Sequence, residues 1–284
     1  MKKYLAQTVV NIVSNAMSLL TRLPIVGNRI KRDFVSKAIQ PMEFHYPSTF
    51  PVSSLLGVVV NNSSFYRLHN LAKKEPETIE FLSKMSSKDI LWDIGANIGQ
   101  ITLPIGKVTG ASIFCFEPDP GNFFILANNI FLNGLSSKVQ IFNLALNDTN
   151  TIVTLPFEEK NVGFALAGRS CLSVSEETNT DNQGLKYPAL TGDIFVDTFE
   201  VSMPTYIKLD VDGNELKILK GLDKVLSSGS VKAIIVEAVF SGSDANSEDI
   251  TELLLTYGYF RSKGEEAPHD SVIKNMVFHY QSND

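Results

Sequence analysis

Four acidic residues each follow a short apolar run, at the point where a buried β-strand is expected to end. The runs and their acids are Ile90-Leu-Trp92 before Asp93, Ile113-Phe-Cys-Phe116 before Glu117, Tyr206-Ile-Lys-Leu209 before Asp210, and Ala233-Ile-Ile-Val236 before Glu237. The carboxyl ends of parallel strands lie along one edge of a doubly wound sheet, where ligands bind. We therefore predict that four carboxylates meet at this edge. Like charges so close raise each other's pKa unless a cation neutralises them, so the ligand, Lys208, or both should be cationic.

The turn after the first of these runs, Asp93-Ile-Gly-Ala-Asn-Ile-Gly99, indicates what the ligand is. Gly95 and Gly99 permit a tight turn and a close backbone approach to a ligand, ahead of a helix with free N–H groups. Glu117 lies 22 residues after Gly95, near the separation at which Rossmann-type folds place an acid on ribose hydroxyls. The glycine pattern is not that of a pyrophosphate-binding turn. A nucleoside without phosphates that carries a positive charge describes S-adenosylmethionine.

Alternating apolar segments of strand and helix length must position these residues. We expect strands at 89–94, 112–117, 139–146, 205–211, 231–238 and about 272–280, and helices at 98–108, 120–132, 213–227 and 247–257, with an earlier helix starting at Glu75-Pro-Glu77. This alternation predicts an α/β fold: a doubly wound, Rossmann-like, mostly parallel seven-stranded sheet with helices on both faces. The Gly-, Ser- and Thr-rich segment 157–195 breaks the rhythm and is expected to be a lid or substrate loop.

Charge divides the chain into an arm, residues 1–40, and a domain, residues 41–284. The arm carries seven basic residues and one acid, whereas the rest carries 18 basic and 30 acidic residues. Proteins bind the phosphate backbone of nucleic acids through Lys and Arg. Because residues 41–284 are so acidic, nucleic acid is an unfavourable substrate. Apolar residues at helical spacing predict an amphipathic helix in the arm that is too polar to span a bilayer. We favour the interpretation that this helix packs on the body or on a partner chain. The alternative is that it lies on an anionic membrane surface.

Several motifs together resemble the FkbM family of class I methyltransferases. They are Asp93-Ile-Gly-Ala-Asn-Ile-Gly99, Phe116-Glu-Pro-Asp-Pro120 with Asn122, Leu126, Asn129 and Asn133, Ile207-Lys-Leu-Asp-Val-Asp-Gly-Asn-Glu215, Glu75-Pro-Glu-Thr-Ile-Glu80 and Asn143-Leu-Ala-Leu146. The resemblance covers roughly residues 75–240. It implies O-methylation of a sugar or natural-product hydroxyl by S-adenosylmethionine.

The resemblance also implies positions for the cofactor. Asp93, Gly95 and Asn97, with Ala96 and Gly99 in the same turn, would lie beside its methionine end. Glu117, with Pro118 next to it, would bind the ribose hydroxyls, and the backbone near Ala145 would meet the adenine. Asp210 would lie near the sulfonium and the acceptor.

Lys208 and Asp210 share one strand face and must form a pair or serve a function, since an isolated buried charge is costly. Two interpretations stay open: a mutual salt bridge, or Asp210 as a general base with Lys208 tuning it or holding the acceptor. Glu237 would orient the acceptor hydroxyl or pair with Lys208. Asp119, before Pro120, is expected to cap a helix, and capping is at least as good a reading as function for Asp212 and Glu215.

The remaining expectations concern metals, compartment and rival functions. No His and carboxylate spacing indicates zinc. The carboxylate edge could hold a divalent ion, since hard cations take oxygen ligands, but nothing in the sequence demands one and we expect no metal. The two cysteines form no disulfide framework, so a reducing, cytoplasmic location is expected. Peripheral contact with a membrane through the arm is the alternative. The rival classes are an NAD-dependent oxidoreductase, disfavoured by the glycine pattern, and a non-catalytic binding protein with a methyltransferase fold.

Overall fold

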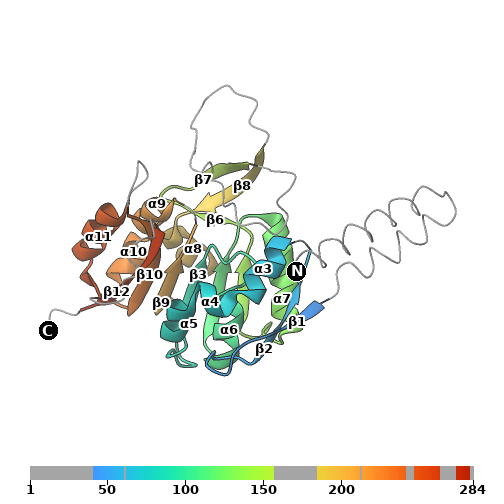
Figure 1. Ribbon diagram of the computed structural model, residues 1–284. Coiled ribbons are helices and arrows are strands. Elements are labelled where there is room, and N and C mark those ends of the chain that lie inside the picture. The colour runs from blue at the N-terminus through green and yellow to red at the C-terminus, as the bar shows by residue number, and fades with distance from the viewer. Residues whose placement is uncertain are drawn as a thin grey trace.

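A central β-sheet organises the chain, which a computed structural model describes at residues 41–60, 62–156, 184–211, 213–240, 246–262 and 273–281. Within these residues, seven strands form one sheet in the order β11-β12-β10-β9-β3-β4-β5 (Figure 1). Their bounds are Tyr259–Arg261 for β11, Ile273–Tyr280 for β12, Ala233–Val239 for β10, Tyr206–Leu209 for β9, Ile90–Ile94 for β3, Ser112–Phe116 for β4 and Val139–Phe142 for β5. The strands β10 to β5 run parallel, whereas β12 is antiparallel to both of its neighbours. The predicted mostly parallel, seven-stranded sheet is confirmed.

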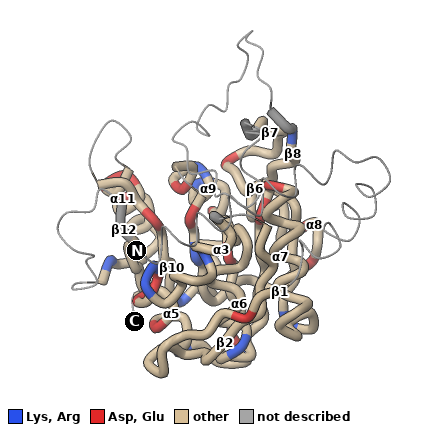
Figure 2. The backbone as a smooth tube through the Cα atoms, turned by 45° about the vertical axis from the view of Figure 1, so that its right-hand side comes forward, with Lys and Arg blue, Asp and Glu red and all other residues tan. Residues whose placement is uncertain are grey.

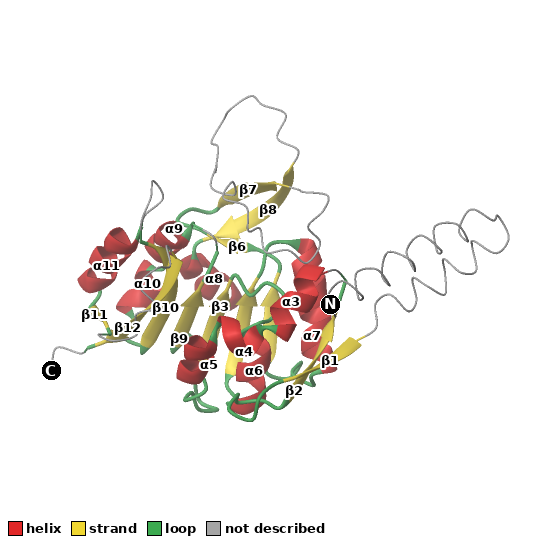
Figure 3. Ribbon diagram, viewed as in Figure 1, coloured by secondary structure: helices red, strands yellow, loops and turns green. Residues whose placement is uncertain are grey.

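Helices cover both faces of this sheet (Figure 3). One face carries α3 (Asn62–His69), α4 (Leu71–Lys74), α5 (Pro76–Leu82), α6 (Thr102–Val108) and α7 (Pro120–Leu132), and the other carries α8 (Gly192–Phe199), α9 (Glu215–Lys220), α10 (Asp223–Ser227) and α11 (Ser247–Thr256). Along β3 the side chain of Leu91 enters the first core, whereas Trp92 and Ile94 enter the second. This alternation follows from the period of two in a strand. The sheet is therefore buried on both faces, as its continuous apolar runs predicted.

Some predictions fall on other parts of the chain. The helix of the arm 1–40, the part of the expected substrate loop from 157 to 183, and Asp212 lie outside the described residues. Where the structure describes the chain, it contains no helix that is long and apolar enough to span a bilayer.

Asn129 of α7 and Asn133, which follows the helix, hold the strand β2 (Ser54–Val58), which pairs with β1 (Pro41–His45). Asn129 accepts a hydrogen bond from the Val58 N–H at 2.7 Å and donates to the Ile98 carbonyl at 2.9 Å. Asn133 accepts from the Leu56 N–H at 3.1 Å and donates back to the Leu56 carbonyl at 2.7 Å. These side chains complete the backbone hydrogen bonds that β2 would otherwise lack. The β1–β2 pair is thereby anchored to the main domain.

The predicted strand over 139–146 is wrong in its extent. The structure divides it into β5 and the short β6 (Ala145–Leu146), which belong to different sheets. At the division, Asn143 Nδ2 donates to the carbonyls of Glu117 and Pro118, each at 2.9 Å. These bonds tie the chain to the turn after β4 and direct it out of the main sheet.

The irregular segment expected over 157–195 is also shorter than predicted. Residues 184–190 form β8 (Gly184–Leu190), and α8 begins at Gly192. The strand β8 lies between β6 and β7 (Thr151–Pro156) in a three-stranded sheet. This small sheet lies above one end of the main sheet (Figure 1).

The helix predicted over 213–227 is interrupted at Gly221. A Cβ atom on Gly221 would lie 2.0 Å from the Asn147 carbonyl oxygen, so the helix meets the loop after β6 at a close backbone contact. A second helix, α10, then starts with its Lys224 and Val225 N–H groups donating to the Asp193 carboxylate at 2.9 and 3.1 Å. A side chain from α8 therefore caps the new helix, which local periodicity could not indicate.

The turn after β3 brings three strand ends into backbone contact. The N–H groups of Gly95 and Ala96 donate to the Phe116 carbonyl at 2.9 and 3.1 Å. Gly95 has a φ of +82°, and a Cβ atom there would lie 1.9 Å from the Asp210 carbonyl oxygen. Packing against β9 therefore requires this glycine, in addition to any ligand. The turn continues to residue 101, so the helix predicted from residue 98 begins only at Thr102.

Replacing Asn129 with alanine should lower the free energy of unfolding by about 2 to 4 kcal/mol, because two buried backbone groups lose their partner. Asn128→Ala is the matched control, since Asn128 is only half-buried and its side chain bonds the Phe124 carbonyl within its own helix. Its effect should stay within about 0.5 kcal/mol. Urea unfolding of both variants measures the difference, and equal effects would contradict the anchoring role of Asn129.

A second comparison isolates the contact at Gly95. Gly95→Ala and Gly134→Ala both place alanine at a positive φ, which costs about 1 to 2 kcal/mol in each case. Only at Gly95 does the new methyl group meet backbone, because nothing lies within 4 Å of a Cβ at Gly134. Gly95→Ala should therefore lower the free energy of unfolding by about 1 to 3 kcal/mol more than Gly134→Ala. Thermal or urea unfolding that shows the two variants to be equal would refute the close approach of β3 and β9.

Candidate active site

The four predicted acids lie around two adjoining cavities at one end of the main sheet. Glu117 and Asp210 directly follow β4 and β9, whereas Asp93 lies one residue before the end of β3 and Glu237 two residues before the end of β10. Glu117 lines the first cavity, Asp93 and Glu237 line the second, and Asp210 lines both. The sequence-based prediction that these carboxylates meet at one edge of the sheet is therefore what the structure shows.

The first cavity is mainly apolar and encloses about 870 Å³, part of it open to solvent. Its lining includes the apolar side chains of Ile94, Phe116, Leu144, Leu146, Val153, Val211 and Ile218. Among the residues that the sequence analysis assigned to the cofactor, Gly95, Asn97, Glu117, Pro118, Ala145 and Asp210 line it as well. A mainly apolar lining with a few polar groups suits a ligand with a flat apolar ring and a few polar groups.

Glu117 is the buried carboxylate of this cavity. Its Oε2 accepts from the Asn97 N–H at 2.7 Å, and its Oε1 accepts from the Asp119 N–H at 2.9 Å. Burial raises the pKa of Glu117 to about 7, although these two backbone bonds partly offset the rise. The Asn122 side chain also hydrogen-bonds this carboxylate. Because two carboxylate oxygens offer about four acceptor positions, there is still room to accept from a ligand's hydroxyl group.

Three residues that line this cavity were not assigned to the cofactor from the sequence. Val153 and Thr154 come from β7, so the small sheet forms one wall. Asn122, at the start of α7, is buried, and among the described residues its Oδ1 has no hydrogen-bond partner. A buried acceptor without a partner is costly, so it fits a donor group on a bound ligand. Only a knowledge of how β7 and β8 pair could have placed the two β7 residues here.

The second cavity is polar, and charged groups of both signs line it. Asp93, Lys208, Asp210 and Glu237 come from the sheet, Arg67, Lys74 and Glu75 come from α3, α4 and the residue that follows, and Ala96 and Gln100 come from the turn. Acidic and basic positions lie close together between β10, α9 and α3 in Figure 2. Arg67, Lys74 and Gln100 were not singled out in the sequence, since they stand in no recognisable motif.

Lys208 joins the acids of the polar cavity. Its side chain is 3% exposed and forms an ion pair with Asp210, as one of the two open interpretations proposed. It also lies beside Asp93 in the parallel register of β3 and β9. Burial alone would lower the pKa of Lys208, but the charges of Asp210, Glu75 and Asp93 raise it above its usual value. The amine therefore stays charged.

Asp93 is the most deeply placed of the acids. It is 1% exposed, and its Oδ2 accepts from the Thr102 hydroxyl at 2.6 Å. Burial raises its pKa, with Lys208 acting against the shift. Asp93 thus lies beneath the turn, where its charge acts on the cavity together with that of Lys208.

Asp210 and Glu237 differ in their affinity for a proton. Burial would raise the pKa of Asp210, but the ammonium group of Lys208 holds it below its usual value. The pKa of Glu237 is raised to about 8 by burial and by the neighbouring charge of Asp210. Within the pair, Glu237 therefore holds a proton more tightly than Asp210 does.

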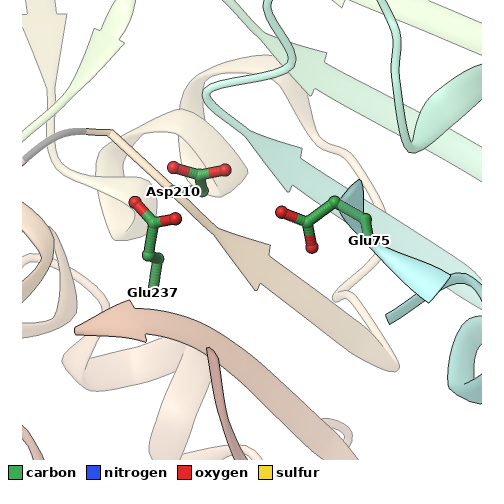
Figure 4. Close-up of side chains that lie close together, drawn as sticks. All are labelled: Glu75, Asp210 and Glu237. Atoms are coloured by element: carbon green, nitrogen blue, oxygen red, sulfur yellow. The ribbon is translucent and has the colours of Figure 1, made fainter. Parts of the chain in front are cut away.

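Glu75, Asp210 and Glu237 point their carboxylates toward a common space (Figure 4). One oxygen of each lies within 4.8 Å of the others. Partners within the protein already contact two of them: Lys208 bonds Asp210, and Asn275 Nδ2 donates to Glu75 Oε2 at 2.8 Å. The expectation of a site without metal stays a prediction.

Other predicted residues have structural roles. Gly99 lines neither cavity, and a Cβ atom there would lie 3.0 Å from Leu126 and 3.1 Å from Leu103. Asp119 caps α7, as predicted, by accepting from the Asn122 N–H at 2.7 Å. Glu215 accepts from the Gly213 N–H at 2.9 Å and so fixes the turn that follows Asp210.

Comparison with known proteins identifies relatives of this chain. The sequence model of the methyltransferase FkbM domain matches residues 93–261. The hexuronic acid methyltransferase AglP of Haloferax volcanii is 29% identical over 209 residues, which are 74% of this chain and 76% of AglP. The methyltransferase sdnD of Sordaria araneosa is 26% identical over 50% of this chain and 64% of its own length. A solved structure of M. jannaschii TYW2 in complex with AdoMet covers 85% of this chain and 87% of its own, with 13% identity and a TM-score of 0.41.

The two cavities fit S-adenosylmethionine, which supplies an activated methyl group on a positively charged sulfur. The apolar cavity offers Glu117 and the unbonded Asn122 Oδ1 to the polar groups of an adenosine. The polar cavity offers charges of both signs to a zwitterionic methionine end. Gly95, Asn97 and Asp210 belong to both cavities, so one molecule can extend from the first into the second.

The match to the FkbM domain extends over more than half of the chain. This chain therefore belongs to the FkbM family of methyltransferases, whose methyl donor is S-adenosylmethionine.

Proposed function

We propose that this chain transfers the methyl group of S-adenosylmethionine to a hydroxyl oxygen of a sugar or glycan. The observation that carries the proposal is the Asp210–Glu237 pair: Asp210 lines both cavities, and Glu237 lines the polar cavity beside it. An alcohol must lose its proton as its oxygen is methylated, so a group able to take a proton is needed there. The relative AglP, whose name describes a hexuronic acid methyltransferase, supports a sugar as the acceptor class.

Glu237 is better suited than Asp210 to take this proton. The sequence analysis placed Asp210 first, but its pairing with Lys208 makes its carboxylate a weak base. The raised pKa of Glu237 gives it a stronger affinity for the proton once it is ionised. In this proposal Asp210 stays charged, faces the positive sulfur of the donor and orients Glu237.

The other residues of the site position the reactants. Glu117 binds the ribose hydroxyls, and the Ala145 region and the apolar wall enclose the adenine. Asp93 and Lys208 fix the charge beneath the turn of Gly95, Ala96 and Asn97. Such positioning can lower the barrier by about 7 to 11 kcal/mol when the reacting atoms are held close to the geometry of attack.

The family membership favours this reading over an NAD-dependent oxidoreductase. Only an experiment distinguishes an active methyltransferase from a non-catalytic binding protein with the same fold. The arm of residues 1–40 and its contact with a partner chain or a membrane surface stay predictions from the sequence, as does a cytoplasmic location. The role of the segment from 157 onward as a lid or substrate loop also stays a prediction.

Incubation of the full chain with S-adenosylmethionine and a panel of neutral and acidic sugar glycosides tests the function. We expect release of S-adenosylhomocysteine that depends on the glycoside, together with a mass gain of one methyl group. The methyl group should survive mild alkali, since an ether resists hydrolysis that removes an ester. Loss of the methyl group in alkali would contradict a hydroxyl acceptor, and donor binding without any turnover on the panel would support the non-catalytic alternative.

The pH dependence of the rate distinguishes the two carboxylates. If ionised Glu237 takes the proton, kcat/KM should rise as the pH increases through about 8 and then level off. Glu237→Gln should lower kcat about 100- to 10,000-fold and abolish this rise. The amino group of the cofactor titrates in the same range, but it does so in both enzymes, so only the difference between their profiles counts.

Glu252→Gln, at an exposed position on α11, is the control and should keep the normal profile. A rate for the unaltered enzyme that is flat between pH 7 and 9 would assign the proton transfer to Asp210, whose pKa is low.

A further inference from the structure

Two cations of the polar cavity have no role in the proposed reaction so far. Arg67 lies on α3 and Lys74 ends α4, and both precede the segment that matches the FkbM domain. They face the acids of the sheet edge from the helical wall of the cavity. Arg67 is near enough to Asp210 for its charge to lower the pKa of that carboxyl group. Arg67 and Lys74 are therefore the cations on the helical side of the cavity, where Glu75 is the acid beside them.

Arg67 is held in place by a neighbour that also lines the cavity. Its Nη1 donates to Oε1 of Gln100, and Gln100 Nε2 donates to the Arg67 carbonyl at 3.3 Å. Gln100 is 8% exposed and belongs to the turn after β3. The guanidinium group is thus fixed relative to the turn that carries Gly95 and Asn97. A fixed, planar guanidinium group suits a carboxylate, because its parallel N–H groups match the two oxygens.

The third cation of the cavity belongs to the sheet edge. Lys208 forms its ion pair with Asp210 and lies beside Asp93. An anionic group entering the polar cavity therefore meets repulsion at the sheet edge and attraction at Arg67 and Lys74. This division of charge orients any ligand that carries both signs.

We propose that Arg67 and Lys74 form a carboxylate-binding subsite of the polar cavity. The inference rests on the proposed function, because both sources of the carboxylate are reactants of that methyl transfer. One source is the methionine end of the cofactor, which reaches this cavity past Gly95 and Asp210. The other is an acidic sugar acceptor. Gln100 is the residue that positions Arg67 for either one.

Calorimetric titration of Arg67→Gln and Lys74→Gln in the full chain tests the subsite. The probes are S-adenosylhomocysteine, which has the carboxylate, and 5′-methylthioadenosine, which lacks the amino acid part. If the subsite binds the cofactor, Arg67→Gln should weaken S-adenosylhomocysteine about 10- to 100-fold and leave methylthioadenosine within about twofold. Lys74→Gln should act in the same direction with a smaller change, since Lys74 is exposed.

If the subsite binds the acceptor, both nucleosides keep their affinity. The KM of a uronic acid glycoside should then rise about 10- to 100-fold in Arg67→Gln, while that of the matched neutral glycoside stays the same. Lys73→Gln is the control, because Lys73 is also exposed on α4 but lines neither cavity. Lys74→Gln keeps the test decisive if Arg67→Gln fails to fold.

The proposal is overturned if the variants weaken both nucleosides equally, or if they change neither nucleoside affinity nor the preference for the acidic glycoside. Absence of S-adenosylhomocysteine binding by the unaltered chain would instead remove the proposed function itself. The two failures are therefore distinguishable.

Discussion

The ion pair between Lys208 and Asp210 is the interaction on which the site depends. Lys208 is buried in the middle strand of the sheet, and an isolated buried ammonium group would be costly. Asp93 beside it and Asp210 two residues on supply the compensating charge, and Lys208 in turn allows these acids to stand close together. Removing either partner leaves an uncompensated buried charge, which typically costs about 3 to 5 kcal/mol. The pair also separates the proton affinities of Asp210 and Glu237, so that two similar carboxylates acquire different chemistry.

The fold divides the site into two cavities of different polarity. Gly95 lets the turn after β3 touch the backbone of Asp210, and that contact forms the boundary at which the apolar and polar cavities meet. On one side, buried Glu117 offers acceptor positions within an apolar wall. On the other, acids and bases face each other. S-adenosylmethionine has the same two parts, a nucleoside and a zwitterion, with the reactive sulfur between them. The match between the polarity of the site and that of the cofactor follows from where the strands end.

The sequence predicted the parts of the site that depend on local order along the chain. The strand ends with Asp93, Glu117, Asp210 and Glu237 could be recognised because parallel strands place their carboxyl ends along one edge. The cap at Asp119 followed from its position before Pro120. The sequence placed Asp210 first as the base, and our proposal prefers Glu237 because of the effect of Lys208 on the pKa of Asp210, which depends on distances that a sequence does not contain.

The features that the sequence did not predict arise from contacts between distant segments. The division of 139–146 into two strands depends on Asn143 bonding the turn after β4, and the break at Gly221 depends on its contact with Asn147. The wall of the apolar cavity formed by β7 exists because β8 pairs with it across a long separation in the chain. Arg67 and Gln100 meet only because α3 packs over the turn. Periodicity along one segment carries no signal for such pairings.

The measurement that tests the account most directly is a crystal structure of the full chain with S-adenosylhomocysteine. We expect the ribose hydroxyl groups within hydrogen-bond distance of Glu117, the sulfur beside Asp210, and the amino acid end in the polar cavity. A nucleoside bound elsewhere on the surface, with Glu117 and Asp210 making no contact to it, would contradict the account.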